Sequence, residues 1–168
     1  MPHSLVLALF GNPSSAAAAA RALRALGLPS ERVSIVARSH DEEGVLARQS
    51  GASPGSDIED SRTAGRLGEL GGHLIAAIAL VLPGVGPIVA DGPLAAELGE
   101  VAGHLAGGIA RTLERTGLDS RTAEEWGERI HRGAVLVGAH VGDIPPEPVR
   151  DVMKQAGATH VEVGNWAD

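Results

Sequence analysis

Two glutamate–histidine pairs have the residue types and the spacing with which a helix could bind a divalent cation. Glu69 precedes His73 by four residues, and Glu100 precedes His104 by the same interval. Residues four apart share one face of an α-helix, so each pair could hold a cation or form a solvated acid–imidazole pair. We favour the solvated pairs, because such pairs are common on helix faces. A divalent metal on these four side chains is the alternative, and no other cofactor is expected.

The remaining polar residues match no catalytic pattern. The chain has no cysteine, which excludes thiol catalysis and thiolate metal sites. Gly84-Val-Gly86 lacks the lysine of a phosphate loop, and no Ser–His–Asp order or nucleophile elbow can be assigned. Lys and Arg number 14 against 21 Asp and Glu, so no basic surface for nucleic acid is predicted. These observations predict a non-enzymatic protein.

The glutamate–histidine pairs lie in a helical passage that occurs twice. Residues 64–79 return 31 residues later as 95–110, with nine of sixteen aligned positions identical. Small residues recur at every fourth position of both copies, so each predicted helix has a ridge that lets another backbone approach closely. This helix-packing ladder consists of Ala64, Gly68, Gly72, Ala76, Ala95, Gly99, Gly103 and Gly107.

The two copies flank a turn signal, Pro83-Gly-Val-Gly-Pro87. If the chain folds back between Val85 and Gly86, the two ladders meet in register, which predicts an antiparallel αα-hairpin over residues 61–116, a glycine zipper. The two histidines would then lie ~9 Å apart along the helix axis. One compact four-ligand metal site within the hairpin would therefore be strained.

Each copy also has an apolar stripe on the side opposite its Glu and His residues. The hairpin is therefore expected to have one apolar side, which must be covered by the rest of the chain, by a second subunit or by lipid. The interface candidates are Leu67, Leu70, Leu74, Ile78, Leu98, Val101, Leu105 and Ile109.

The chain outside the hairpin predicts alternating strands and helices. Apolar runs, helix-capping residues and glycines that end helices divide this part of the chain into separate elements. They predict a βαβ unit before the hairpin, one helix directly after it, and then a second βαβ unit. We therefore expect an α+β protein, a ferredoxin-like split βαβ sandwich formed by residues 1–60 and 117–168, with 61–116 inserted. His140 and His160 are expected at the sheet surface, and Trp126 and Trp166 as packing or interface anchors. The predicted strands cover 5–10, 32–38, 134–141 and 159–163, and the helices run to Leu26, from Asp119 or Ser120 to about Arg132, and over 147–156.

The organisation of the chain resembles the bacterial general-stress, heat-induced-stress-protein family with a glycine-zipper insert. The likeness rests on 7–10 with the alanine-rich helix, on 26–38, on the turn at 83–87 and on 130–141. The resemblance implies a stress-associated bacterial protein and offers no catalytic residues to carry over.

The N-terminal apolar run has no preceding Lys or Arg and is short for a signal peptide, so we expect a cytoplasmic protein, with membrane association as an alternative. Residues 70–90 lack charged side chains, but Pro83 and Pro87 divide them, which disfavours a membrane span. We therefore predict a homo-oligomer that self-associates through the hairpin. The alternatives are metal or small-ligand binding by the Glu/His stripe, and peripheral membrane binding.

Overall fold

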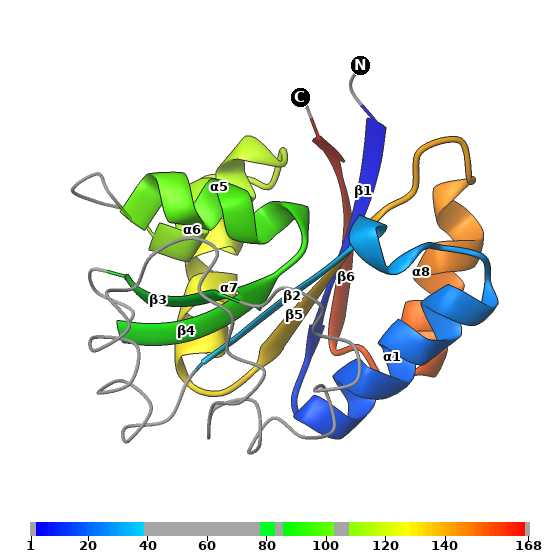
Figure 1. Cartoon of the computed structure of the whole chain (residues 1–168), viewed down its shortest axis with the longest axis horizontal. Helices are drawn as coiled ribbons and strands as arrows, with labels where there is room; N and C mark the ends of the chain where they lie inside the picture. Colours follow the sequence, from blue (N-terminus) through cyan, green and yellow to red (C-terminus); the bar gives the residue numbers. More distant parts are fainter. Residues whose placement is uncertain (1–2, 39–77, 83–85, 103–107, 167–168) are drawn as a thin grey trace.

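The protein is an α+β molecule built on one antiparallel sheet, as the computed structural model in Figure 1 shows. The structure describes residues 3–38, 78–82, 86–102 and 108–166 of the 168-residue chain. Its strands are β1 (His3–Phe10), β2 (Val33–Arg38), β3 (Ile78–Leu82), β4 (Gly86–Asp91), β5 (Val135–His140) and β6 (His160–Trp166). Its helices are α1 (Pro13–Ala25), the 3₁₀ turn η1 (Ser30–Arg32), α5 (Pro93–Ala102), α6 (Gly108–Arg115), α7 (Ser120–His131) and α8 (Pro146–Gln155).

The strands follow the order β3-β4-β2-β5-β1-β6, and each of the five pairings is antiparallel. β5 lies between β1 and β2, which α1 connects, and β1 lies between β5 and β6, which α8 connects. In this register Leu7 on β1 faces Gly138 on β5 and Glu162 on β6. The predicted α+β class is confirmed.

Local sequence signals determine where the helices of both βαβ units begin and end. The Asn12 side chain accepts a hydrogen bond from Ser15 N–H at 2.9 Å, so Asn12 caps α1. Asp119 caps α7 as expected, and its hydrogen bonds from Thr122 lower the pKa of its carboxyl. The predicted glycine stops, Gly27 after α1 and Gly157 after α8, both have positive φ.

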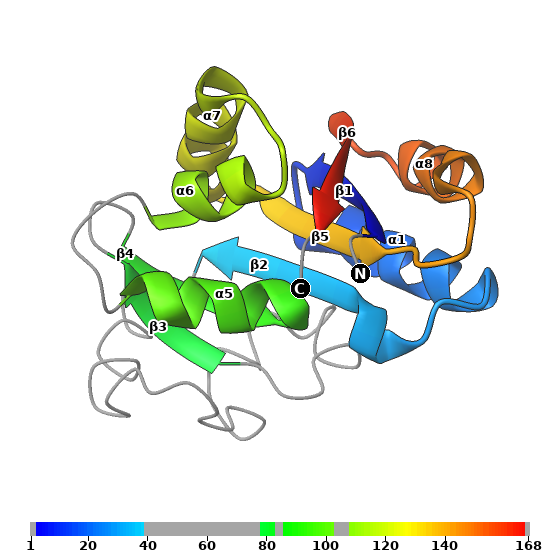
Figure 2. The same cartoon turned by 90° about the horizontal axis from the view of Figure 1, so that it is seen from above.

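The central strands β1 and β5 are covered on both faces, which explains why they are apolar at consecutive positions. α1 and α8 cover one face, and α5, α6 and α7 cover the other, as Figures 1 and 2 show. The first core contains Val6, Phe10 and Val137, whereas the second contains Leu5, Leu7 and Trp126. Alternate residues of β1, β2 and β5 therefore belong to different cores.

The predicted helical hairpin is wrong on both sides of its turn. Ile78–Leu82 and Gly86–Asp91 are strands that pair with each other, and β4 also pairs with β2. Both segments are short, apolar runs rich in Ile and Val, which suit a strand as well as a helix when periodicity is the only guide. Pairing of β4 with both β2 and β3 satisfies its backbone groups, and the two strands extend the sheet. The first copy of the repeat, up to residue 77, lies outside the described residues.

The second copy of the repeat is helical where the structure describes it. α5 and α6 pack on the sheet, and Leu94, Leu98, Ile109 and Leu113 are at most 1% exposed in the second core. The chain itself therefore covers Leu98 and Ile109 of the predicted apolar stripe. Within the described residues, no helix is both long and apolar enough to cross a membrane.

Candidate functional sites

The structure places some of the predicted site residues in the fold of the chain itself. In the predicted ladder, Ala95 is buried in the second core and Gly99 lies in α5. In the predicted interface, Ile78 lies in β3 and Val101 in α5, while Leu98 and Ile109 are core residues. The ladder and interface residues outside the described parts are Ala64, Gly68, Gly72, Ala76, Gly103, Gly107, Leu67, Leu70, Leu74 and Leu105.

The predicted metal site has one member in the described residues, Glu100, which lies in α5. Glu69, His73 and His104 lie outside them. Within the part of the chain that the structure describes, no three His, Cys, Asp or Glu side chains gather in a group that could hold a metal ion. The four-ligand metal site therefore stays a prediction.

A chain of hydrogen-bonding groups crosses the sheet from β1 to the start of α5, and the sequence did not reveal it. His3 Nε2 lies 3.0 Å from His140 Nδ1, and His140 Nε2 lies 3.4 Å from Ser34 Oγ. Leu94 N–H, in the first turn of α5, donates to Ser34 Oγ at 3.1 Å. These four residues, here called the histidine chain, link β1, β5, β2 and α5.

The histidine chain is buried except at its outer end. His140 is 3% exposed and Ser34 is fully buried, whereas His3 is half-buried. Trp166 packs edge-on against His140, with ring centroids 5.0 Å apart. The prediction that His140 lies at the sheet surface is wrong, because α5 and the Trp166 side chain cover that face of β5.

One sequence signal could have located the histidine chain. β5 reads Val-Leu-Val-Gly-Ala-His, which indicates a strand covered on both faces, and a polar side chain buried in such a strand requires a partner. Its partners could not be identified, because His3 and Ser34 are 137 and 106 residues away from His140.

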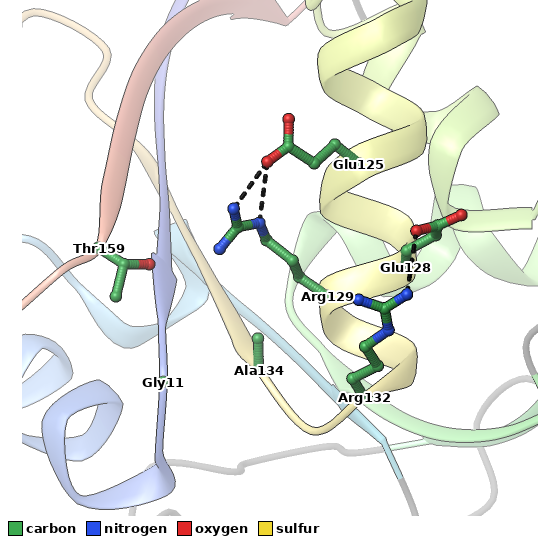
Figure 3. A pocket seen from close by; sticks show the side chains of 7 residues that line it. All are labelled: Gly11, Glu125, Glu128, Arg129, Arg132, Ala134 and Thr159. Carbon is green, nitrogen blue, oxygen red and sulfur yellow. Dashed lines mark hydrogen bonds and ion pairs between the residues drawn. The ribbon is translucent and has the colours of Figure 1, made fainter.

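A shallow cleft of about 390 Å³ lies between α7 and the ends of β1 and β6, as Figure 3 shows. Arg129 donates from Nε and Nη2 to Glu125 Oε1 at 3.1 and 2.7 Å, and Arg132 pairs with Glu128 at 3.5 Å. Hydrogen bonds and positive charge from Arg129 lower the pKa of the Glu125 carboxyl. The complete lining is Gly11, Glu125, Glu128, Arg129, Arg132, Ala134 and Thr159. Because the two arginines and two glutamates pair with each other along α7 and its C-terminal cap, the cleft presents balanced charge to solvent.

The third candidate is the outer edge of β6, the last strand of the sheet. Val163 is 42% exposed, and it is one of two large hydrophobic side chains exposed among the described residues; the other is Leu26, at 38%. Asn165 N–H donates to Thr116 O at 2.8 Å, so the connection between α6 and α7 covers the C-terminal end of this edge. Figure 2 shows β6 at the margin of the sheet between α7 and α8.

No protein family, curated protein or solved structure was found to match the chain. The geometry of these three candidates is therefore the basis on which a function can be proposed.

Proposed function

We propose that the chain is a non-enzymatic protein that self-associates through the outer edge of β6. The observation that carries this proposal is the exposure of Val163, 42%, in the middle of an edge strand. Edge strands present unpaired backbone groups that can pair with another strand. A second copy of the same strand is the simplest partner, because a two-fold axis pairs a strand with itself in the antiparallel sense.

The described geometry favours binding over catalysis. Ser34, the hydroxyl in contact with a histidine, is fully buried, so it is not accessible to a substrate. The charged side chains of the cleft are committed to ion pairs on α7. Self-association through Leu98 and Ile109 is not proposed again, because both side chains are core residues of the same chain.

Three registers of a β6–β6 pair keep like faces together, centred on Val161, Glu162 or Val163. Centring on Glu162 places two carboxylates opposite each other, which is unfavourable. Centring on Val163 uses the backbone N–H of Asn165, which already donates to Thr116 O, and centring on Val161 likewise uses that of Thr159, which donates to Leu9 O, so this test does not separate the two registers. Centring on Val161 places His160 opposite the second copy's Glu162, an oppositely charged pair when the imidazole is protonated. We therefore infer the register centred on Val161.

We further propose a ferredoxin-like arrangement for the two βαβ units. The strand order β2-β5-β1-β6 and the positions of α1 and α8 on one face support this interpretation. The sequence resemblance supports a stress-associated role. That role is tested by the abundance of the protein in its source cells before and after heat and osmotic stress, and an unchanged abundance under both would contradict it.

Sedimentation velocity of the purified protein tests the self-association. Edge pairing of one short strand buries less area than a standard interface, so we expect a weak dimer. The experiment should therefore cover protein concentrations from about 1 to about 300 µM. The sedimentation coefficient of the wild type should rise with concentration. Val163→Lys should abolish the rise, because it introduces a charge at the centre of the edge.

Leu26→Lys is the matched control. Leu26 has almost the same exposed fraction as Val163, but it lies at the end of α1, on another part of the surface. This variant should sediment like the wild type. A wild type that stays monomeric throughout the range refutes self-association, and an equal loss in both variants refutes the assignment to β6.

A further inference from the structure

Neutral imidazoles satisfy the histidine chain in either of two proton arrangements. When His3 donates to His140, His140 can donate from Nε2 to Ser34; in the reverse arrangement Ser34 donates to His140 and His140 to His3. In both arrangements Ser34 Oγ accepts the N–H of Leu94. When both imidazoles are neutral, each hydrogen bond of the histidine chain therefore has one donor and one acceptor.

Protonation changes this balance in two steps. A proton on His140 leaves it donating to both neighbours, but it places a charge on a ring that is 3% exposed, where desolvation penalises the ion. A second proton, on His3, brings two N–H donors and two positive charges face to face at 3.0 Å. The bond between the two imidazoles is then lost.

Several described groups near His140 disfavour a positive charge on its ring. The N-terminal end of α5, where the helix dipole is positive, contacts Ser34 through the N–H of Leu94. Glu97, one turn later in α5, forms an ion pair with Arg115. From β6, Trp166 packs on the ring, while Glu162 is exposed opposite Leu7.

From β1, the nearest titratable group is His3 itself. On the side of β2, the Arg32 guanidinium lies beside Gly142, just after the end of β5, and adds a positive charge near this end of the sheet.

The start of α5 depends on close contact with β2. A Cβ on Gly92, the residue before α5, would lie 2.5 Å from Val33 O, and Leu94 packs over Gly138 of β5. The hydrogen bond from Leu94 to Ser34 fixes this approach. A positive charge on His140 would therefore act, through Ser34, against the positive N-terminal end of α5.

We propose that the histidine chain is an acid-sensitive contact that holds the N-terminal end of α5 on the sheet at neutral pH and releases it when the imidazoles take up protons. The closed state binds fewer protons than the released state, so a fall in pH through the ordinary histidine range shifts the equilibrium toward release. This device does not depend on self-association.

Amide hydrogen exchange of the full chain at about pH 7.5 and about pH 5.5, corrected for the intrinsic rate, tests the proposal. If one imidazole has a pKa near 6.5 in the released state, the protection of the Leu94 amide should fall roughly tenfold between about pH 7.5 and about pH 5.5. The amide of Val149, in α8 on the opposite face, is the internal reference and should keep its protection. An equal loss at Val149 would show global unfolding and refute a local release.

His140→Gln supplies the decisive variant, because glutamine keeps a donor and an acceptor but does not titrate in this range. Protection at Leu94 should then change less than about twofold between the two pH values, whereas His131→Gln, an exposed histidine on α7, should behave like the wild type. A tenfold loss that persists in His140→Gln overturns the proposal. If that variant does not fold, NMR titration of the wild-type imidazoles decides: an independent single-site curve near 6.5 for His140 contradicts the coupling.

Discussion

Gly164 is the residue of β6 at which the fold leaves no room for a side chain. A Cβ at this position would lie 2.1 Å from the carbonyl oxygen of Thr116, and the same oxygen accepts the N–H of Asn165. We expect Gly164→Ala to lower the free energy of unfolding by about 1–3 kcal/mol, because the backbone at Thr116 must move. Chemical denaturation measures the change.

Gly127 provides the contrasting substitution. It lies in α7, where a Cβ would meet Ala110 at 3.7 Å, an ordinary contact distance. Because alanine is the better helix former, Gly127→Ala should raise the free energy of unfolding by up to about 1 kcal/mol. If Gly164→Ala is also neutral or stabilising, the close approach of Thr116 to β6 is wrong.

Single residues also mark the limit of what the sequence predicts. The glutamate–histidine pairs can be recognised from the sequence alone, because their members are four residues apart. The histidine chain was missed because His3, Ser34 and His140 meet through strand order, and strand order is a property of the whole sheet. Contacts of this kind require the topology before they can be predicted.

At the scale of elements, α5 is a core helix of the chain. Leu98 is 1% exposed and belongs to the core that covers the β1 and β5 side chains of the second face. We expect Leu98→Ala to lower the free energy of unfolding by about 2–5 kcal/mol through the cavity that it leaves. Leu26→Ala, at a 38% exposed position, should cost less than about 1 kcal/mol. Equal small effects in thermal or chemical unfolding would show that α5 does not pack on the sheet.

The elements of the two βαβ units were predictable because several local signals agree. Apolar runs, the Asp119 cap and the glycine stops gave α1, β2, α7, β5, α8 and most of β1 and β6 within a few residues. β3 and β4 were not predictable in the same way. Their Ile and Val residues fit a buried helix and a buried strand equally well, and the pairing of β4 with β2 decides between the two.

At the scale of the whole molecule, the absence of cysteine makes the proposed dimer register directly testable. In an antiparallel pair centred on Val161, the two Val161 residues face each other across the two-fold axis. Their Cα atoms would then be about 5.5 Å apart, within the range of a disulfide. Val161→Cys should therefore form a disulfide-linked dimer under mild oxidation, which non-reducing electrophoresis and intact mass would detect.

Val163→Cys is the matched control at the same edge. In the register centred on Val161, each residue 163 faces residue 159 of the second copy, so the two introduced cysteines lie about 13 Å apart and cannot bond without slippage. A register centred on Val163 reverses the pattern, and one centred on Glu162 brings neither pair into direct opposition. Efficient linkage at position 163 with none at 161 would therefore overturn the charge argument from His160 and Glu162 while keeping β6 as the contact. Linkage at neither position would overturn the register centred on Val161, and sedimentation of the wild type and of Val163→Lys would then decide whether β6 pairs at all.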